Sequence, residues 1–255
     1  MSPVLNVHEF GPADGAPVLM LHGITGHGAR FKRLAEEHLY DYHVIAPDLR
    51  GHGMSTNLPP WTLEQHAADL LTVLDSLKVT GLPVVGHCFG GAAAIHLARL
   101  APQRVTKLIL LDPSIGLDPK FALETMAPWP HVFPTIEKAG EWQRNEWAGI
   151  SLRDVEEELH ENFMQISGRW LPKYSHSAVC TAWSEMCRAA QLPPPATRTL
   201  LVCAPKAGIV RPAFVQACQV TMRENLDLAE MDCGHMMYLE RPAETADLIA
   251  GFIEG

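Results

Sequence analysis

The sequence predicts an α/β protein with a doubly wound, mostly parallel sheet. Short, fully apolar segments alternate along the chain with longer segments in which apolar residues recur at helical spacing. Short apolar segments are typical of strands that are buried on both faces of a parallel sheet. Alternation of such strands with helices is the pattern of doubly wound folds. A chain of 255 residues is near the upper size for one hydrophobic core, so a single α/β core is expected.

The predicted elements of this core follow one another in regular order. The strands cover residues 18–21, 43–46, 82–85, 108–111, 200–203 and 226–231. The helices cover residues 29–38, 63–77, 90–100 and 243–253. Thr62 stands where a helix N-cap is expected, and Pro242 lies just before the last helix.

Residues 117–195 interrupt the alternation. This stretch is helix-forming and ends in three consecutive prolines at 193–195. It is rich in aromatic residues, namely Trp129, Phe133, Trp142, Trp147, Phe163, Trp170, Tyr174 and Trp183. We interpret it as a helical cap or lid inserted into a core formed by residues 1–116 and 196–255. The alternative is additional core, because aromatic residues at helical spacing usually pack inward.

Charge and composition narrow the classes of function. A formal net charge of -9 repels phosphate backbones, and no run of Lys and Arg offsets it, so nucleic acid is not an expected partner. The first twenty residues lack the features of a signal peptide, and no segment has the length and hydrophobicity to cross a membrane. We therefore expect a cytoplasmic protein without a membrane partner. The sequence does not predict the oligomeric state.

Cys88 differs from the other cysteines in its surroundings. The chain has six cysteines, at 88, 180, 187, 203, 218 and 233, which are too few for a disulfide framework and show no CxxC spacing. A free cysteine is most often a small buried apolar residue. Cys88, however, lies in the sequence GHCFGG (86–91), between a predicted strand and a predicted helix. This arrangement is a nucleophile elbow, in which flanking glycines permit a tight turn and the helix N-terminus favours a thiolate.

The segment LHGITG (21–26) directly follows the first predicted strand. Its glycines allow a backbone N–H group to face a pocket, and two such donors stabilise the oxyanion that forms during acyl transfer. We predict that Ile24 and Phe89 provide these donors. The alternative is that residues 21–26 form an ordinary turn.

His235 is the predicted general base. It follows the last predicted strand and precedes the final helix, which singles it out among thirteen histidines, most of which we expect at the surface or in packing roles.

These motifs together resemble the α/β-hydrolase superfamily. They are LHG (21–23), DLRGHGMS (48–55), GHCFGG (86–91) and GH (234–235). The resemblance implies that Cys88 is the nucleophile, that His235 is the base, and that residues 117–195 are a cap that encloses the substrate. Most GHSxGG members carry serine at the elbow, whereas members of the dienelactone hydrolase branch carry cysteine. Similarity to that branch rests on Cys88 alone.

The acid of the expected triad is the second departure from the family. In most members it follows the penultimate strand, where residues 203–210 of this chain contain no carboxylate. Asp112 is the predicted substitute, because some members take the acid from the strand that precedes the cap. Asp112 could instead cap a turn before Pro113, and Asp232 is too near His235 to be preferred. We hypothesise that the departures are linked, since a thiol depends less than a hydroxyl on the orienting acid.

The resulting hypothesis is a hydrolase for an ester, lactone or thioester of an apolar or aromatic small molecule, acting through an acyl-cysteine without a metal or organic cofactor. Two other functions remain open. An acyltransferase would use the same cysteine, and a slow-turnover ligand receptor would use the same fold. An engineered replacement of serine by cysteine is also compatible with the sequence.

Overall fold

The structure is a computed structural model that describes residues 4–126 and 132–255. Within these residues the strands of the main sheet are β1 (Val7–Phe10), β2 (Ala16–Leu21), β3 (Tyr42–Pro47), β4 (Leu82–His87), β5 (Val105–Leu111), β8 (Thr199–Cys203) and β9 (Leu226–Glu230). The helices beside this sheet are α1 (Lys32–His38), α2 (Leu63–Ser76), α3 (Phe89–Leu100), α8 (Pro212–Met222), α9 (Met237–Glu240) and α10 (Pro242–Glu254).

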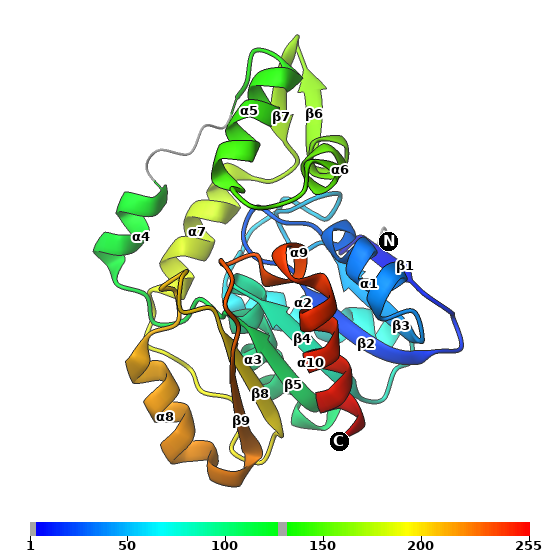
Figure 1. Ribbon diagram of the computed structural model, residues 1–255, viewed down its shortest axis with the longest axis vertical. Coiled ribbons are helices and arrows are strands. Elements are labelled where there is room, and N and C mark those ends of the chain that lie inside the picture. The colour runs from blue at the N-terminus through cyan, green and yellow to red at the C-terminus, as the bar shows by residue number, and fades with distance from the viewer. Residues whose placement is uncertain (1–3, 127–131) are drawn as a thin grey trace.

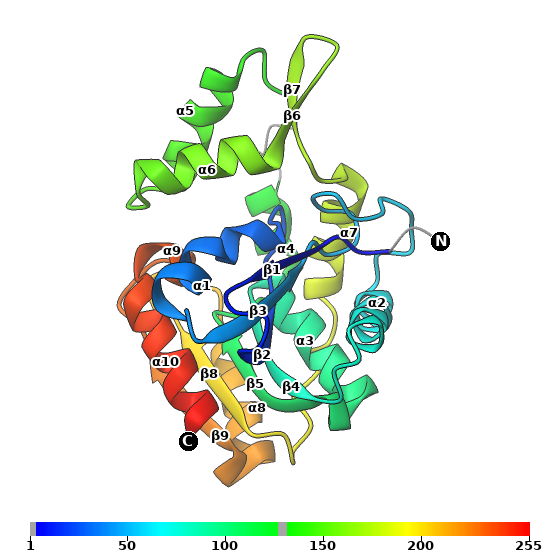
Figure 2. The same cartoon turned by 90° about the vertical axis from the view of Figure 1, so that its right-hand side faces the viewer.

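The main sheet has the strand order β1-β3-β2-β4-β5-β8-β9. β1 is antiparallel to β3, and the other neighbouring strands are parallel. Helices α2, α3 and α8 cover one face, and α1, α9 and α10 cover the other (Figures 1 and 2). The prediction of a doubly wound, mostly parallel α/β fold is confirmed.

β2 shows why its sequence is apolar at successive positions. Leu19 and Leu21 pack in the core on the α2 and α3 face, whereas Val18 and Met20 pack on the α1 and α10 face. Side chains of a strand point alternately to the two faces, so a strand covered on both sides needs apolar residues at every position. All six predicted strands correspond to strands of this sheet.

Some elements were not predicted from the sequence. β1 is a partly exposed edge strand with the mixed sequence VHEF, which has neither a continuous apolar run nor a strict alternation. The predicted helix at 29–38 consists of a short 3-10 helix, Gly28–Phe31, followed by α1. α8 and the short α9 were also missed. In contrast, Thr62 caps α2 as expected, because its side chain accepts a hydrogen bond from the backbone N–H of Gln65.

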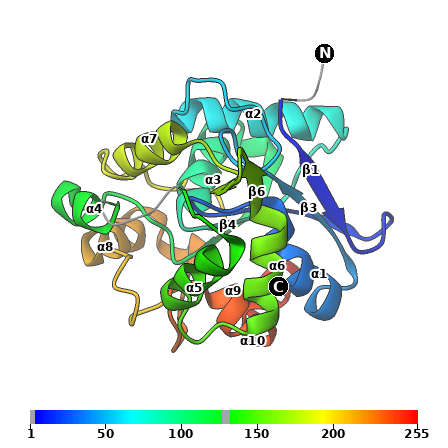
Figure 3. The ribbon, with the colours of Figure 1, turned by 90° about the horizontal axis from the view of Figure 1, so that it is seen from above.

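Between β5 and β8 the chain forms a separate group of elements. They are α4 (Pro119–Met126), α5 (Ile136–Glu146), α6 (Leu152–Asn162), β6 (Phe163–Ile166), β7 (Arg169–Pro172) and α7 (His176–Met186). β6 and β7 pair as an antiparallel hairpin, so this region is not purely helical as the sequence analysis expected. Figures 1 and 3 show α5, α6 and the hairpin above the main sheet. Trp129 lies outside the described residues.

The turns that follow parallel strands lie at one edge of the sheet, which is the usual place for a ligand site in open α/β folds. Here the turns after β2, β4, β5 and β9 bring together the residues discussed below. None of the described helices is long and apolar enough to cross a membrane.

We predict that buried histidines make the fold sensitive to acid. Burial, together with the nearby charges of His52 and Arg50, lowers the pKa of His66 from 6.5 to about 3. Between pH 6.5 and about pH 3, His66 is protonated in the unfolded chain but neutral in the folded protein. Protonation therefore stabilises the unfolded chain, and the free energy of unfolding decreases as the pH falls through this range. His66→Leu should remove this contribution, which has a slope of at most about 1.4 kcal/mol per pH unit.

Urea unfolding at a series of pH values measures this effect for the wild type and the variant. Equal slopes of the free energy of unfolding against pH in both proteins would contradict the prediction.

Candidate active site

Cys88 lies in the tight turn between β4 and α3. Its backbone is in an unusual region, with φ 55° and ψ -121°, where a side chain is strained. Hydrogen bonds hold it there: its N–H donates to the carbonyl of Leu111 at 3.1 Å, and its carbonyl accepts the N–H of Ser114 at 3.2 Å. The end of β5 therefore fixes the turn that presents the Cys88 side chain.

Two glycines permit the close packing around Cys88. A Cβ atom at Gly90 would collide with the backbone carbonyl of Leu21, so only glycine lets α3 approach β2 this closely. A Cβ atom at Gly23 would lie 2.8 Å from Cys88 Cβ and 3.2 Å from its Sγ. Glycine at position 23 thus lets the turn after β2 approach the Cys88 side chain closely, as the sequence motifs predict.

Asp112 and His235 form a hydrogen-bonded pair beside Cys88. Asp112 follows β5 directly, and its Oδ2 accepts a hydrogen bond of 2.6 Å from His235 Nδ1. The Asp112 side chain is completely buried, whereas 27% of the His235 side chain is exposed. The imidazole is therefore anchored on its inner side and open on the side of the cavity described below.

The segment after β8, where most family members carry the acid, supports Asp112 instead. The backbone N–H of Ala204 donates to Asp112 Oδ1 at 3.0 Å. Asp232, the other carboxylate considered from the sequence, is 84% exposed and forms an ion pair with Lys206 at 2.7 Å. Asp112, and not Asp232, is thus the carboxylate that is hydrogen-bonded to His235.

Two residues that the sequence analysis did not single out hold the His235 turn. His87 Nε2 donates to the carbonyl oxygen of His235 at 2.8 Å, and the N–H of Gly234 donates to Glu240 Oε2 at 2.7 Å. The place of His87 beside Cys88 in the elbow motif is a signal that could have marked it. Glu240 has no comparable sequence signal.

Ser114 is a further residue that the sequence analysis missed. Its Oγ lies 3.2 Å from Cys88 Sγ, and the residue is 2% exposed. Its position two residues after Asp112, at the same strand end, could have indicated a hydroxyl near the elbow. Ser114 therefore supplies a hydrogen-bonding group directly at the sulfur.

Electrostatics favour a thiolate and an imidazolium at this site. Burial raises the pKa of the Cys88 thiol, but the charge and hydrogen bond of His235, with hydrogen bonds from Ser114 and the Phe89 N–H, lower it below its usual range. Burial lowers the pKa of His235, but the charge of Cys88 and the hydrogen bond to Asp112 raise it well above its usual range. The proton therefore favours the imidazole over the sulfur.

Ile24 and Phe89, the two predicted oxyanion donors, both lie close to Cys88, in space and in the chain respectively. Ile24 lines the cavity next to Cys88, and Phe89 is the first residue of α3. The side chain of Phe89 is buried against His66, with ring centroids 5.1 Å apart. Its backbone N–H is free of an α-helical partner at this position, as in the first turn of any helix.

Cys88 and His235 open into a cavity of about 210 Å³ below α5, α6 and the hairpin. Several aromatic residues of the 117–195 segment line it, namely Trp142, Trp147, Phe163, Tyr174 and Trp183. Phe133 and Trp170 pack instead in a small cluster with Trp142 and Phe163. The exposed surface of the cavity wall is thus largely apolar, but polar residues also line it, namely Cys88, His235 and Ser114 together with Thr25, Arg30, His87, Thr125, Gln143, Glu146, Glu158 and Asn162.

Metal-binding side chains are not clustered in the part of the chain that the structure describes. No group of three or more His, Cys, Asp or Glu residues there is arranged to hold a metal ion.

Comparison with known proteins agrees with the geometry. The model of the alpha/beta hydrolase family matches residues 18–248. Lipase LipV of Mycobacterium tuberculosis is 36% identical over 254 residues, which cover 96% of each chain. The solved structure of E-2-(acetamidomethylene)succinate hydrolase superposes with a TM-score of 0.84 at 22% identity and covers 98% of this chain and 95% of its own. The structure of a marine microorganism esterase superposes with a TM-score of 0.80 at 19% identity, and the match covers 98% of this chain and 100% of the esterase chain. At these identities the two structures show the fold alone.

We predict that His235→Ala raises the pKa of the Cys88 thiol, because burial is then no longer opposed by the imidazolium. Ser114→Ala should shift it in the same direction by a smaller amount. The pH dependence of iodoacetamide alkylation, read on the Cys88 peptide by mass spectrometry, measures the pKa in each variant. An unchanged alkylation profile in His235→Ala would rule out the ion pair.

Proposed function

Because this chain belongs to the alpha/beta hydrolase family, we propose that it is a hydrolase of the esterase or lipase type with Cys88 as its nucleophile. Its substrate is an ester, lactone or thioester of an apolar or aromatic small molecule. The observation that carries this proposal is that Asp112 hydrogen-bonds to His235, and that His235 and Cys88 interact and line the same aromatic-rich cavity.

The acylation step begins from the ion pair. The Cys88 thiolate attacks the carbonyl carbon, a C–S bond forms, and the carbonyl electron pair moves to oxygen. The N–H groups of Ile24 and Phe89 donate hydrogen bonds to this oxyanion. When the oxyanion collapses, the bond to the leaving group breaks and His235 gives its proton to the departing alcohol.

Deacylation uses the same groups in reverse roles. Neutral His235 takes a proton from water as the water oxygen attacks the thioester carbon. The C–S bond then breaks, the acid product leaves, and the thiolate and imidazolium are restored. No metal or organic cofactor takes part in this scheme.

Asp112 acts through His235. Its carboxylate accepts a hydrogen bond from Nδ1–H, which leaves Nε2 as the nitrogen that exchanges a proton with the sulfur, the alcohol and water. The N–H of Ala204 fixes the carboxylate in turn. This arrangement supports Asp112 as the acid of the triad.

Residues 117–195 are proposed to be the cap, with residues 1–116 and 196–255 as the catalytic core. The proposal is supported by the position of α5, α6 and the hairpin above the sheet and by the aromatic side chains that they contribute to the cavity. An apolar wall around a few polar groups is typical of a small-molecule site. We infer an apolar or aromatic acyl or alcohol group on this basis.

The first test is mass spectrometry of the intact protein after exposure to a panel of activated aryl esters. A mass increase equal to the acyl group is expected in the wild type and should be absent in Cys88→Ala, because the thioester forms on that sulfur. The same adduct in Cys88→Ala would disprove the assignment. Faster loss of the adduct with added alcohols or amines than with water would indicate an acyltransferase, and adduct that persists without turnover would indicate a receptor.

We further predict that Asp112→Asn lowers kcat/KM for the best ester by about 10²-fold to 10³-fold, less than the roughly 10⁴-fold effect known for serine triads. The smaller loss follows from the higher acidity of a thiol. Asp232→Asn is the matched control and should stay within about twofold of the wild type, because its carboxylate faces solvent. Steady-state kinetics that show the opposite ranking of these variants would assign the acid to Asp232.

A further inference from the structure

Thr25 has a strained backbone and a carbonyl group that is held by two donors. Its φ is 60°, in the left-handed region that a β-branched residue rarely adopts. Its carbonyl oxygen accepts hydrogen bonds from Asn162 Nδ2 at 2.9 Å and from Arg30 Nη2 at 3.0 Å. A conformation of this kind persists only where the surrounding structure fixes it.

Thr25 belongs to the same tight turn as Ile24, the proposed oxyanion donor. The N–H of Gly26 donates to the carbonyl of Gly23 at 3.1 Å, which closes a turn with Ile24 and Thr25 at its centre. Thr25 Oγ1 also donates to the carbonyl oxygen of Ile24 at 2.6 Å. Displacement of the Thr25 carbonyl would therefore reorient the peptide groups of the whole turn.

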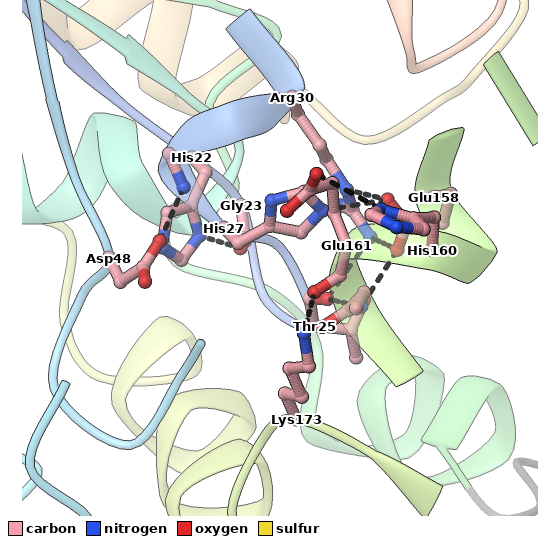
Figure 4. A network of polar contacts seen from close by, with 12 residues as sticks. His22, Gly23, Thr25, His27, Arg30, Asp48, Glu158, His160, Glu161 and Lys173 are labelled. Atoms are coloured by element: carbon pink, nitrogen blue, oxygen red, sulfur yellow. Dashed lines mark hydrogen bonds and ion pairs between the residues drawn. The ribbon is translucent and has the colours of Figure 1, made fainter. Parts of the chain in front are cut away.

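Glu158 fixes both donors to Thr25. Arg30 Nε and Nη2 donate to its carboxylate at 2.8 and 2.6 Å (Figure 4). Asn162 Nδ2 donates to the same carboxylate at 2.7 Å. His27 Nε2 lies 3.0 Å from Glu158 Oε2. Burial raises the pKa of Glu158, but the charges of Arg30 and His27 outweigh burial and hold the pKa well below its usual range, so the carboxylate stays ionised.

Arg30, Asn162 and Glu158, the three side chains that hold the Thr25 carbonyl directly or indirectly, come from two different parts of the chain. Arg30 lies in the 3-10 helix that follows the turn, whereas Glu158 and Asn162 lie on α6, one helical turn apart and on the same face. Glu158 and Asn162 are both buried, and each has only 2% of its surface exposed. The turn at the thiol is thus held from the proposed cap as well as from the core.

We propose that Asn162 and Glu158 are positioning residues that set the geometry of the oxyanion site through the Thr25 carbonyl. Neither residue acts on the reacting atoms. Asn162 donates directly to Thr25, and Glu158 orients Asn162 and Arg30. This inference rests on the proposed function, because it requires that Ile24 donates to an oxyanion. It implies that α6 must be docked for the oxyanion site to be complete.

The test separates oxyanion stabilisation from reactivity of the sulfur. Acylation by p-nitrophenyl acetate passes through a tetrahedral oxyanion on the carbonyl carbon. In thiolation, the Cys88 thiolate attacks the thiomethyl sulfur of methyl methanethiosulfonate, an S–S bond forms and methanesulfinate leaves, so no carbonyl oxyanion forms. In Asn162→Leu, the acylation rate at saturating ester should fall by about 10-fold to 100-fold, since loss of one oxyanion donor costs about 10²-fold to 10³-fold. The half-saturating ester concentration should change by less than about threefold, and the rate of thiolation of Cys88 by less than about twofold.

Asn225→Leu is the matched control, because Asn225 Nδ2 donates to the carbonyl of Pro195 at the same distance of 2.9 Å but far along the chain from the turn. Both of its rates should equal those of the wild type. If the leucine variant does not fold, the same two rates are measured on Asn162→Ala, which removes the donor without adding bulk.

Three outcomes would overturn the inference, and they differ from one another. Equal losses in acylation and thiolation would mean that Asn162 has only a structural role. Retention of both rates would mean that the hydrogen bond to Thr25 does not position the turn. Thiolation of the wild type without any acylation would refute the proposed function itself, before any variant is compared, and the inference would fall with it.

Discussion

The buried carboxylate of Asp112 is the group on which the arrangement of the site depends. It lies at the end of β5 and accepts two hydrogen bonds, one from the N–H of Ala204 after β8 and one from Nδ1–H of His235 after β9. A carboxylate without exposed surface is costly unless its oxygens are hydrogen-bonded. Satisfying both oxygens therefore fixes three strand ends relative to one another, and the position of the imidazole against the Cys88 sulfur follows from this constraint.

The same carboxylate bears on how the cysteine is explained. The sequence raised the hypothesis that cysteine compensates for a missing acid, since residues 203–210 contain no carboxylate. In the structure Asp112, at the end of β5, accepts a hydrogen bond from His235, and the link between the two departures stays a hypothesis. The ion pair offers another reason for the cysteine. His235, Ser114 and the Phe89 N–H all favour the thiolate, and they offset the cost of burying it.

Sequence reasoning succeeded where one local pattern reports one physical requirement. Strands covered on both faces must be apolar throughout, and this pattern located β2, β3, β4, β5 and β8. β9 was also predicted, although it is a partly exposed edge strand with the mixed sequence LDLAE. Cys88 and Asp112 were singled out because each lies just after the end of a predicted strand. β1 is a half-exposed edge, and its pairing with β3 is specified by contacts distant in the chain. Glu158 likewise gains its importance from Arg30, which lies 128 residues away in the chain, and no local pattern contains such a contact.

α6 lies beside an apolar cavity but is held to the core by polar contacts, and the two kinds of contact have different roles. Apolar burial is non-directional, so aromatic side chains alone would allow α6 to settle in several positions. Charged hydrogen bonds have defined lengths and directions. Arg30 with Glu158 and Arg33 with Asp154 both join the α1 region to α6, the second pair at 2.6 Å. These directional contacts select one position for α6. In that position Asn162 donates a hydrogen bond to the Thr25 carbonyl, in the turn that begins at Gly23 beside Cys88.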